Sequence, residues 1–171
     1  KLQGKREDEF IDGVINELNV SFDLQDKELE RIPAEGPVIV VANHPFGAHD
    51  AILLESLLRK VRRDYKIMAN GFFSAIDEMQ ERMILVNAFK NKNKENSNPL
   101  RESVKYLKEG GILGVFPSGT VSHFDVNKRC VTDPEWSETI AGLVKMTGAT
   151  VVPVHFSGRN SLRFNIAGLI H

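Results

Sequence analysis

Two ionisable side chains, His44 and Asp50, are separated by five residues that include a proline and two small residues. A carboxylate beside an imidazole fixes the tautomer of the ring and stabilises the imidazolium that forms, which is what a general base requires. The pair also has a structural interpretation, in which Asp50 complements the dipole of a helix and His44 is an ordinary turn residue. Taken alone, the pair favours the structural interpretation. The choice between the two interpretations therefore depends on the surrounding sequence.

Continuous apolar runs and one-sided stripes alternate along the chain and indicate strands and helices in turn. Strands are predicted at 37–42, 65–69, 83–86, 112–116 and 151–154, with a half-buried strand at 20–24. Helical patterns cover 10–18, 52–61, 98–109 and 133–147, a short amphipathic stretch covers 72–79, and 90–98 and 119–132 are predicted to be loops. The alternation predicts an α/β layered fold with a central, largely parallel mixed sheet flanked by helices.

Three segments with polar or glycine-rich sequence follow predicted strands directly: 43–50, 117–123 and 155–161. In open α/β sheets ligands bind at the carboxyl ends of the strands. We therefore expect these three loops to gather at one edge of the sheet, with His44 and Asp50 among them.

The composition is that of an ordinary globular domain, with 171 residues, 42% of them hydrophobic and 26% charged, and a net charge of −1. These values exclude disorder and coiled coil, and they argue against a dedicated nucleic-acid binder. The single cysteine, Cys130, cannot form an intrachain disulfide, and the spacing of the five histidines does not suggest a metal site. No apolar run has the length needed to cross a bilayer. We expect one intracellular domain that can touch a membrane surface.

Four segments together resemble the signatures of the PlsC-like glycerolipid/lysophospholipid acyltransferase superfamily. Asn43-His44-Pro45-Phe46-Gly47-Ala48-His49-Asp50 resembles the first signature, and its gap of five residues resembles the hemolysin-like branch. The segment 116–122 resembles the third signature and 151–156 the fourth, whereas 69–73 occupies the place of the second without its usual arginine. Because the segments occur in the expected order at strand ends, the joint match favours the functional interpretation of His44 and Asp50.

The resemblance implies a glycerol-3-phosphate acyltransferase-like fold and an acyl transfer in membrane lipid synthesis. His44 would take the proton from the acceptor hydroxyl, which attacks the thioester of acyl-CoA or acyl-carrier protein, while Asp50 orients His44. No cofactor or metal is implied. Gly119 and Thr120 are expected to present backbone N–H groups to the acceptor or the oxyanion. The full set of expected substrate-binding residues is Asn43, Phe46, Gly47, Phe72, Pro117, Ser118, Gly119, Thr120 and Arg159.

The third signature departs from the family pattern at two positions. Ser118 and Val121 stand where the family usually has a glutamate and an arginine that engage the acceptor, often through its phosphate. An uncharged pair cannot make such a contact. The expected acceptor is therefore the hydroxyl of a lysophospholipid, another glycerolipid or an aminolipid, and not a simple glycerol phosphate. The resemblance implies a single acyltransferase domain over 1–171, and because family members usually continue past the fourth signature, it leaves room for a truncation at the C-terminus.

The sequence is also compatible with other functions and with other roles for two of its segments. Ser118 follows a strand and could be the nucleophile of an esterase or thioesterase, and a catalytically inactive, lipid-binding family member is a third reading. The basic residues of 90–108 could receive an acidic carrier protein, coenzyme A phosphates or anionic headgroups, or form a solvated face. The apolar residues of 72–79 could line an acyl groove or pack in the core. The expected location is cytoplasmic, peripherally associated with the inner face of the cell membrane.

Overall fold

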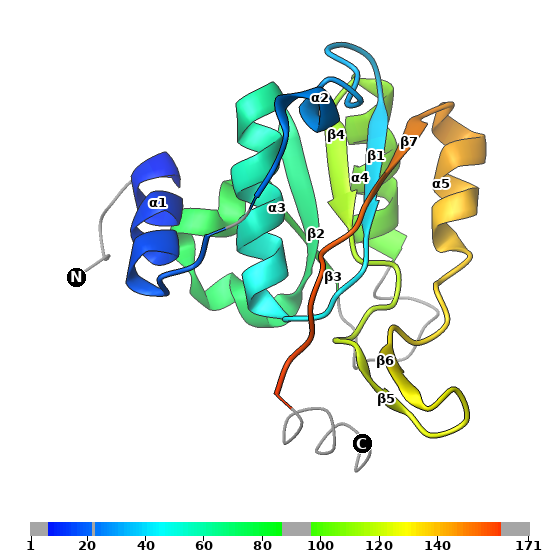
Figure 1. The fold of residues 1–171 in the computed structure, drawn as a ribbon. Coiled ribbons are helices and arrows are strands. Elements are labelled where there is room, and N and C mark those ends of the chain that lie inside the picture. Colours follow the sequence, from blue (N-terminus) through cyan, green and yellow to red (C-terminus); the bar gives the residue numbers. More distant parts are fainter. Residues whose placement is uncertain (1–6, 22, 87–96, 162–171) are drawn as a thin grey trace.

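A five-stranded parallel sheet forms the centre of the computed structural model, which describes residues 7–21, 23–86 and 97–161 (Figure 1). The strands are β1 (Val38–Ala42), β2 (Tyr65–Asn70), β3 (Met83–Val86), β4 (Ile112–Val115) and β7 (Thr150–Val154). Their order is β3-β2-β4-β1-β7, and every pairing between them is parallel. The α/β prediction is confirmed, and the predicted bounds of these five strands agree with the structure to within one residue at either end.

The central strand β1 explains why its sequence is a continuous β-branched run. All five of its residues are buried, because β4 and β7 pair with its two sides and helices cover both faces of the sheet. The outer neighbour β7 contains Pro153. Proline has no backbone N–H to donate, and an edge strand tolerates this because only one of its sides is paired.

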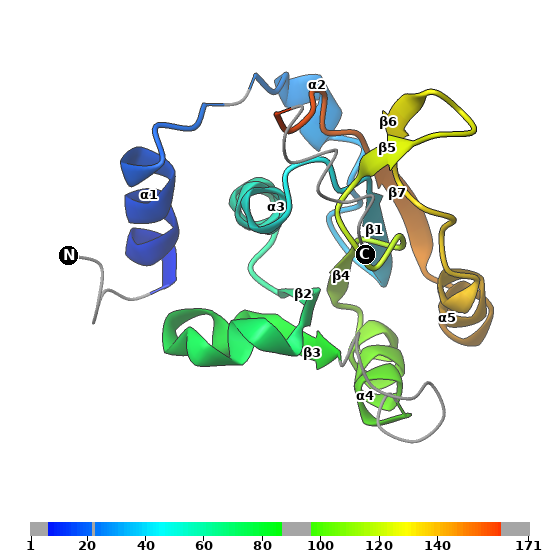
Figure 2. The ribbon, with the colours of Figure 1, turned by 90° about the horizontal axis from the view of Figure 1, so that it is seen from below.

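Helices cover the two faces of the sheet. α1 (Glu7–Glu17) and α3 (Ala48–Val61) lie on one side, and α4 (Ser97–Lys108) and α5 (Thr139–Thr147) lie on the other, as Figure 2 shows from below. Successive residues of β1 accordingly contribute to two separate cores. Val40 packs with Leu54 on the α3 side, and Ile39 packs with Leu107 on the other.

Three predictions of local structure were wrong. The segment 20–24 is not a strand: its described residues have no regular structure, and Leu24 packs directly onto the α3-side core without a sheet partner. Two short strands, β5 (His123–Asp125) and β6 (Cys130–Thr132), pair as an antiparallel hairpin within the predicted loop 119–132. The helix predicted from Asp133 begins only at Thr139, because the Asp133 carboxylate binds groups outside that helix.

The other short elements lie between these. The amphipathic stretch 72–79 is divided between two 3₁₀ helices, η1 (Gly71–Ala75) and η2 (Asp77–Arg82), and α2 (Asp26–Leu29) is a single turn. In η2, Met79 is buried against Ile11 of α1, which favours the core interpretation of this stretch. Of the loop predicted at 90–98, residues 90–96 lie outside the described part of the chain.

α3 carries a second buried carboxylate besides Asp50. Glu55 is 2% exposed, and its Oε1 atom accepts a hydrogen bond of 3.2 Å from the hydroxyl of Tyr65. Its Oε2 atom is buried without a hydrogen-bond partner in the described structure. Burial raises the pKa of Glu55 to about 7, against the opposing effects of the Tyr65 hydrogen bond and of Arg82 and Arg59.

Replacement of the fully buried Leu54 tests the α3-side core. Leu54→Ala should lower the free energy of unfolding by about 2–5 kcal/mol, because it removes methyl groups from a packed site and leaves a cavity. The exposed Leu18 is the matched control, and Leu18→Ala should change the same quantity by less than about 0.5 kcal/mol. Urea denaturation followed by circular dichroism measures both. Equal effects of the two substitutions would contradict the assigned packing of α3.

The raised pKa of Glu55 predicts a loss of stability as the pH rises. Between the unfolded value of 4.5 and the folded value of about 7, the native state holds the proton more tightly than the unfolded state. The free energy of unfolding therefore falls as the pH rises through this window, by an amount on the order of 3 kcal/mol at most. Glu55→Gln removes the titration, so the difference in stability between variant and wild type should move in favour of the variant from pH 5 to pH 8. A difference that does not depend on pH would contradict the prediction.

Candidate active site

His44 and Asp50 lie side by side at the carboxyl edge of the sheet. The His44 Nδ1 atom is 3.0 Å from the Asp50 Oδ2 atom, and the two side chains are 17% and 0% exposed. The carboxylate oxygen lies off the direction of a hydrogen bond from Nδ1, so the contact is a close polar pair and not an aligned hydrogen bond. Hydrogen bonds of catalytic groups are often poorly aligned before substrate binds.

The local fold explains why Asp50 can be buried. It sits in the first turn of α3, and its Oδ2 atom accepts hydrogen bonds from the backbone N–H groups of Phe46 (2.8 Å) and Gly47 (3.0 Å). Gly47 adopts a φ of +72°, and a Cβ atom there would approach Val121 Cγ2 to 3.2 Å. The turn between His44 and Asp50 thus depends on glycine at position 47 and on the carboxylate at position 50.

The ring and the backbone of His44 are held separately. The imidazole stacks on the Phe116 ring, with centroids 4.2 Å apart. The His44 N–H donates to Asp133 Oδ1 (3.2 Å), and the His44 carbonyl accepts from the Ser122 N–H (2.8 Å). Asp133 also accepts hydrogen bonds from the Ser122 hydroxyl and, at Oδ2, from Trp136 Nε1 (2.9 Å).

Sequence reasoning missed Asp133 and Ser122 as parts of the site. Asp133 precedes a proline, which made it look like the start of a helix, and it lies 89 positions from His44. Ser122 is the last residue of the segment 116–122, which resembles the third signature. No local signal identifies either residue, because their role depends on the folding of 117–133 back onto the loop after β1.

The three expected loops do meet at this edge. Asn43 binds the backbone of Phe156 twice: its Nδ2 donates to the Phe156 carbonyl (2.9 Å) and its Oδ1 accepts from the Phe156 N–H (2.7 Å). Asn160 Nδ2 donates to the Pro45 carbonyl (2.8 Å). The ring of Phe46 covers Gly158, where a Cβ atom would approach Phe46 Cζ to 2.7 Å. The loop 43–50 therefore contacts 155–161 on one side and 117–123 on the other.

Several predicted substrate-binding residues have structural roles in this arrangement. The side-chain amide of Asn43 is occupied by the backbone of Phe156. The Gly119 N–H donates to the Phe116 carbonyl (3.0 Å), so this turn does not offer that N–H to an oxyanion, contrary to our expectation. The Ser118 hydroxyl donates to the Thr120 carbonyl (2.8 Å), which is not a base that could activate a nucleophile.

Apart from Phe46, the remaining predicted substrate-binding residues make no described contact with His44 or Asp50. Pro117 is buried, and its carbonyl accepts from the Ser137 N–H (3.0 Å), whereas Thr120 and Arg159 are exposed. Phe72 belongs to η1, but its side chain lies outside the described part of the structure. Among the predicted residues whose side chains are described, Phe46 alone also lines a large groove.

That groove, of about 1010 Å³, begins next to the His44–Asp50 turn and runs along α3. His49, Leu53 and Leu57 line it from successive turns of the helix, which leads from the site toward the core. Opposite them, Phe156, Val154 and Val152 line it from alternate positions of β7 and the loop that follows. The third wall includes Leu24, Leu29 and Ile32. Apolar side chains thus predominate along its walls, with polar side chains at His49 and, beside Leu24 and Leu29, at Asp23, Glu28 and Arg31. Its volume is at the upper end of the range for ligand sites.

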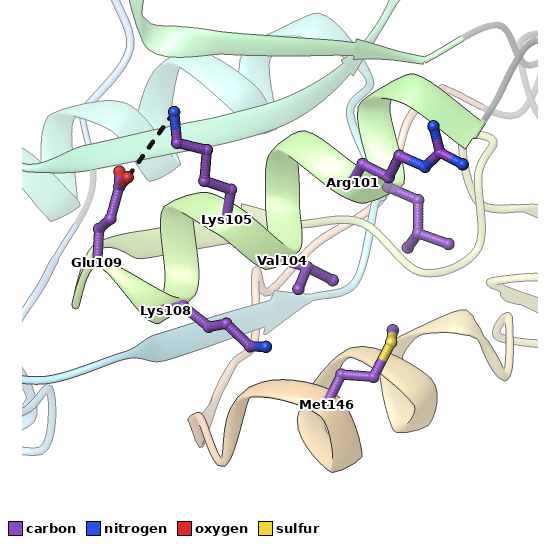
Figure 3. A pocket seen from close by; sticks show the side chains of 7 residues that line it. Arg101, Val104, Lys105, Lys108, Glu109 and Met146 are labelled. Atoms are coloured by element: carbon purple, nitrogen blue, oxygen red, sulfur yellow. Dashed lines mark ion pairs between the residues drawn. The ribbon is translucent and has the colours of Figure 1, made fainter.

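A second groove, of about 500 Å³, lies between α4 and α5 on the other face of the sheet (Figure 3). Its lining combines the basic Arg101, Lys105 and Lys108 with apolar side chains such as Val104 and Met146, and Lys105 pairs with Glu109. It contains none of the predicted catalytic or substrate-binding residues. Among the described residues, no three His, Cys, Asp or Glu side chains group as a metal ion would require. None of the helices described is long and apolar enough to cross a membrane.

Loss of the Asp133 carboxylate should loosen the backbone of His44. In Asp133→Asn an amide N–H₂ must face the Trp136 or the His44 N–H group, so the free energy of unfolding should fall by about 1–3 kcal/mol. The His44 amide proton should also exchange faster with solvent, as nuclear magnetic resonance can measure. The control is Asp23→Asn, at an exposed carboxylate, for which we expect a change within about 0.5 kcal/mol. Unchanged protection of the His44 amide would contradict the assigned hydrogen bond between the His44 N–H and Asp133.

Known proteins were compared with the chain as a whole. The family model described as Acyltransferase matches residues 23–157, which include the loops 43–50 and 117–123 and the first three residues of the loop 155–161. A lyso-glycine lipid O-acyltransferase of Phocaeicola vulgatus is 26% identical over 163 residues, covering 94% of this chain and 56% of the relative. The protein of the same name from Bacteroides thetaiotaomicron is 25% identical over 163 residues, covering 94% of the chain and 57% of the relative. The chain thus spans a little over half the length of these curated relatives. Since the family model covers most of the chain, the chain belongs to the Acyltransferase family.

Proposed function

We propose that this chain transfers a fatty acyl group from an acyl thioester to the hydroxyl of a lysolipid. The observation that carries the proposal is the contact between His44 Nδ1 and the fully buried Asp50, inside the segment that the family model matches. With Nδ1 beside the carboxylate, Nε2 on the other edge of the ring is the nitrogen that accepts a proton. Phe116 holds the plane of the ring.

In the proposed reaction His44 Nε2 takes the proton of the acceptor hydroxyl as its oxygen attacks the thioester carbonyl. The carbon–oxygen bond of the new ester forms and the carbon–sulfur bond breaks. The proton held by His44 then passes to the departing thiolate, so the histidine returns to its neutral form. Asp50 stabilises the imidazolium between these two steps. Acyl-CoA and acyl-carrier protein are the proposed donors, and no metal or further cofactor takes part.

We propose an aminolipid as the acceptor. The relatives from Phocaeicola vulgatus and Bacteroides thetaiotaomicron are named lyso-glycine lipid O-acyltransferases, and Ser118 and Val121 remove the charges that would favour a phosphate headgroup. Long acyl chains would occupy the groove along α3, whose apolar walls lead away from His49. The gap of five residues between His44 and Asp50 supports assignment to the hemolysin-like branch, and we propose a peripheral location at the inner face of the cell membrane.

Replacement of His44 tests the proposed base. His44→Ala should lower the rate of acyl transfer by roughly 10²–10⁴-fold, the usual contribution of a general base. The control is His123→Ala, because the ring of His123 contacts the Val121 carbonyl and has no proposed part in the reaction. Thermal unfolding verifies that both variants are folded. Transfer is measured with labelled acyl-CoA and acyl-carrier protein, and the products are identified by mass.

The acceptor panel contains a lyso-glycine lipid, lysophosphatidic acid and a mixture without acceptor. We expect acylation of the lyso-glycine lipid in preference to lysophosphatidic acid. Wild-type transfer rates in folded His44→Ala would refute the base. An acyl group on Ser118 with thioester hydrolysis in the absence of acceptor would establish the esterase alternative, and lipid binding without any thioester turnover would establish an inactive lipid-binding protein.

A further inference from the structure

The β5–β6 hairpin extends from the body of the molecule at the carboxyl edge of the sheet (Figure 1). Its tip is the turn 126–129 between the paired residues Asp125 and Cys130. Val126 is 63% exposed, the largest exposed fraction among the large hydrophobic side chains described as exposed. Val126 belongs to none of the hydrophobic clusters of the described residues, so the packing of the fold does not explain an apolar side chain at this position.

The turn presents cations beside this apolar side chain. The Lys128 side chain is 60% exposed, and Arg129 and Asn127 are exposed as well. Asp125 Oδ1 accepts hydrogen bonds from the backbone N–H groups of Asn127 (2.8 Å) and Lys128 (3.0 Å), which shapes the turn. The Asp125 carboxylate lies 3.8 Å from Lys128 Nζ and offsets one of the two positive charges.

Arg129 occupies a backbone conformation that usually favours glycine, with a φ of +54°. An arginine at such a position carries a conformational cost that glycine or asparagine would reduce. The Arg129 side chain is exposed and makes no hydrogen bond or ion pair within the described part of the chain, so its guanidinium group is available to a partner outside the protein.

The base of the same hairpin holds His44. Ser122 immediately precedes β5 and its N–H donates to the His44 carbonyl, while Asp133 immediately follows β6 and accepts from the His44 N–H. Whatever the tip contacts is therefore linked through two short strands to the proposed base.

We propose that the tip of the β5–β6 hairpin docks on an anionic lipid surface. Val126 enters the headgroup region, while Lys128 and Arg129 contact lipid phosphates. A folded protein partner fits this feature less well, because a stable protein interface needs a broad surface on each side and the tip is a single turn. The consequence that docking presents His44 to a lipid acceptor rests on the proposed function, but the docking itself does not.

The test uses Cys130, the only cysteine of the chain, which is exposed at the start of β6. It is labelled with an environment-sensitive fluorophore, and the labelled full chain is titrated with vesicles. Vesicles of phosphatidylglycerol and phosphatidylcholine in equal parts should shift the emission to the blue, whereas phosphatidylcholine alone should not. The shift should weaken as salt rises, because salt screens the attraction between cations and headgroups.

Variants of the tip separate the two contributions. Lys128→Glu and Arg129→Gly should each lower the partition coefficient by roughly fivefold or more, and Val126→Asp should do the same. The matched controls are Lys145→Glu on α5 and Leu18→Asp beside α1, which change an exposed charge and an exposed apolar side chain elsewhere. Both controls should bind like the wild type. Circular dichroism verifies that each variant is folded, and Arg129→Gly is expected to be at least as stable as the wild type.

Three results would overturn the proposal. The first is the absence of a shift with anionic vesicles, and the second is a shift that the tip variants retain. The third is a shift produced by acyl-carrier protein in solution and not by vesicles, which would assign the tip to a protein partner. His44→Ala should bind vesicles normally, and because no acyl donor is present in the titration, failure of the acyl-transfer proposal would leave this result unchanged.

Discussion

The Asp50 carboxylate is the feature on which the rest of the site depends. A fully buried carboxylate is costly unless donors surround it. Here two backbone N–H groups of the preceding turn donate to Oδ2, with His44 Nδ1 at 3.0 Å from the same atom, while Oδ1 is buried without a hydrogen-bond partner in the described part of the chain. Because one oxygen serves all three contacts, the conformation of the turn and the position of the imidazole are set together. α3 then carries this carboxylate at a fixed place against the sheet.

The loops around this carboxylate are stabilised mainly by contacts between side chains and backbone groups. Asn43 binds Phe156, Asn160 binds Pro45, and Asp133 binds His44, in each case over a large distance in sequence. Such hydrogen bonds hold the loops in place and do not involve the side chains of His44 and Asp50. The groove along α3 therefore opens beside loops whose backbone is held in place by these hydrogen bonds.

The sequence allowed most of the sheet to be predicted, because its strands are short apolar runs that no amphipathic helix would show. The run 38–42 is buried throughout for this reason. The grouping of loops could also be predicted, since parallel strands place their carboxyl ends at one edge. Asp133 could not be predicted as part of the site, because a proline after an aspartate has the same appearance at a helix start and at a hairpin end. Likewise, the alternation at 20–24 reflects packing of single side chains on the core, which a strand pattern imitates.

Gly158 shows how far the requirements of this centre reach beyond its polar groups. It has no functional side chain, yet the ring of Phe46 occupies the space where a methyl group would be, and the N–H of Phe46 is one of the donors to Asp50. A methyl group at this position would displace the ring and, through it, the donor. A survey of substitutions across this chain would therefore find Gly158 as sensitive to replacement as the polar residues of the site. An inventory restricted to reactive side chains would overlook it.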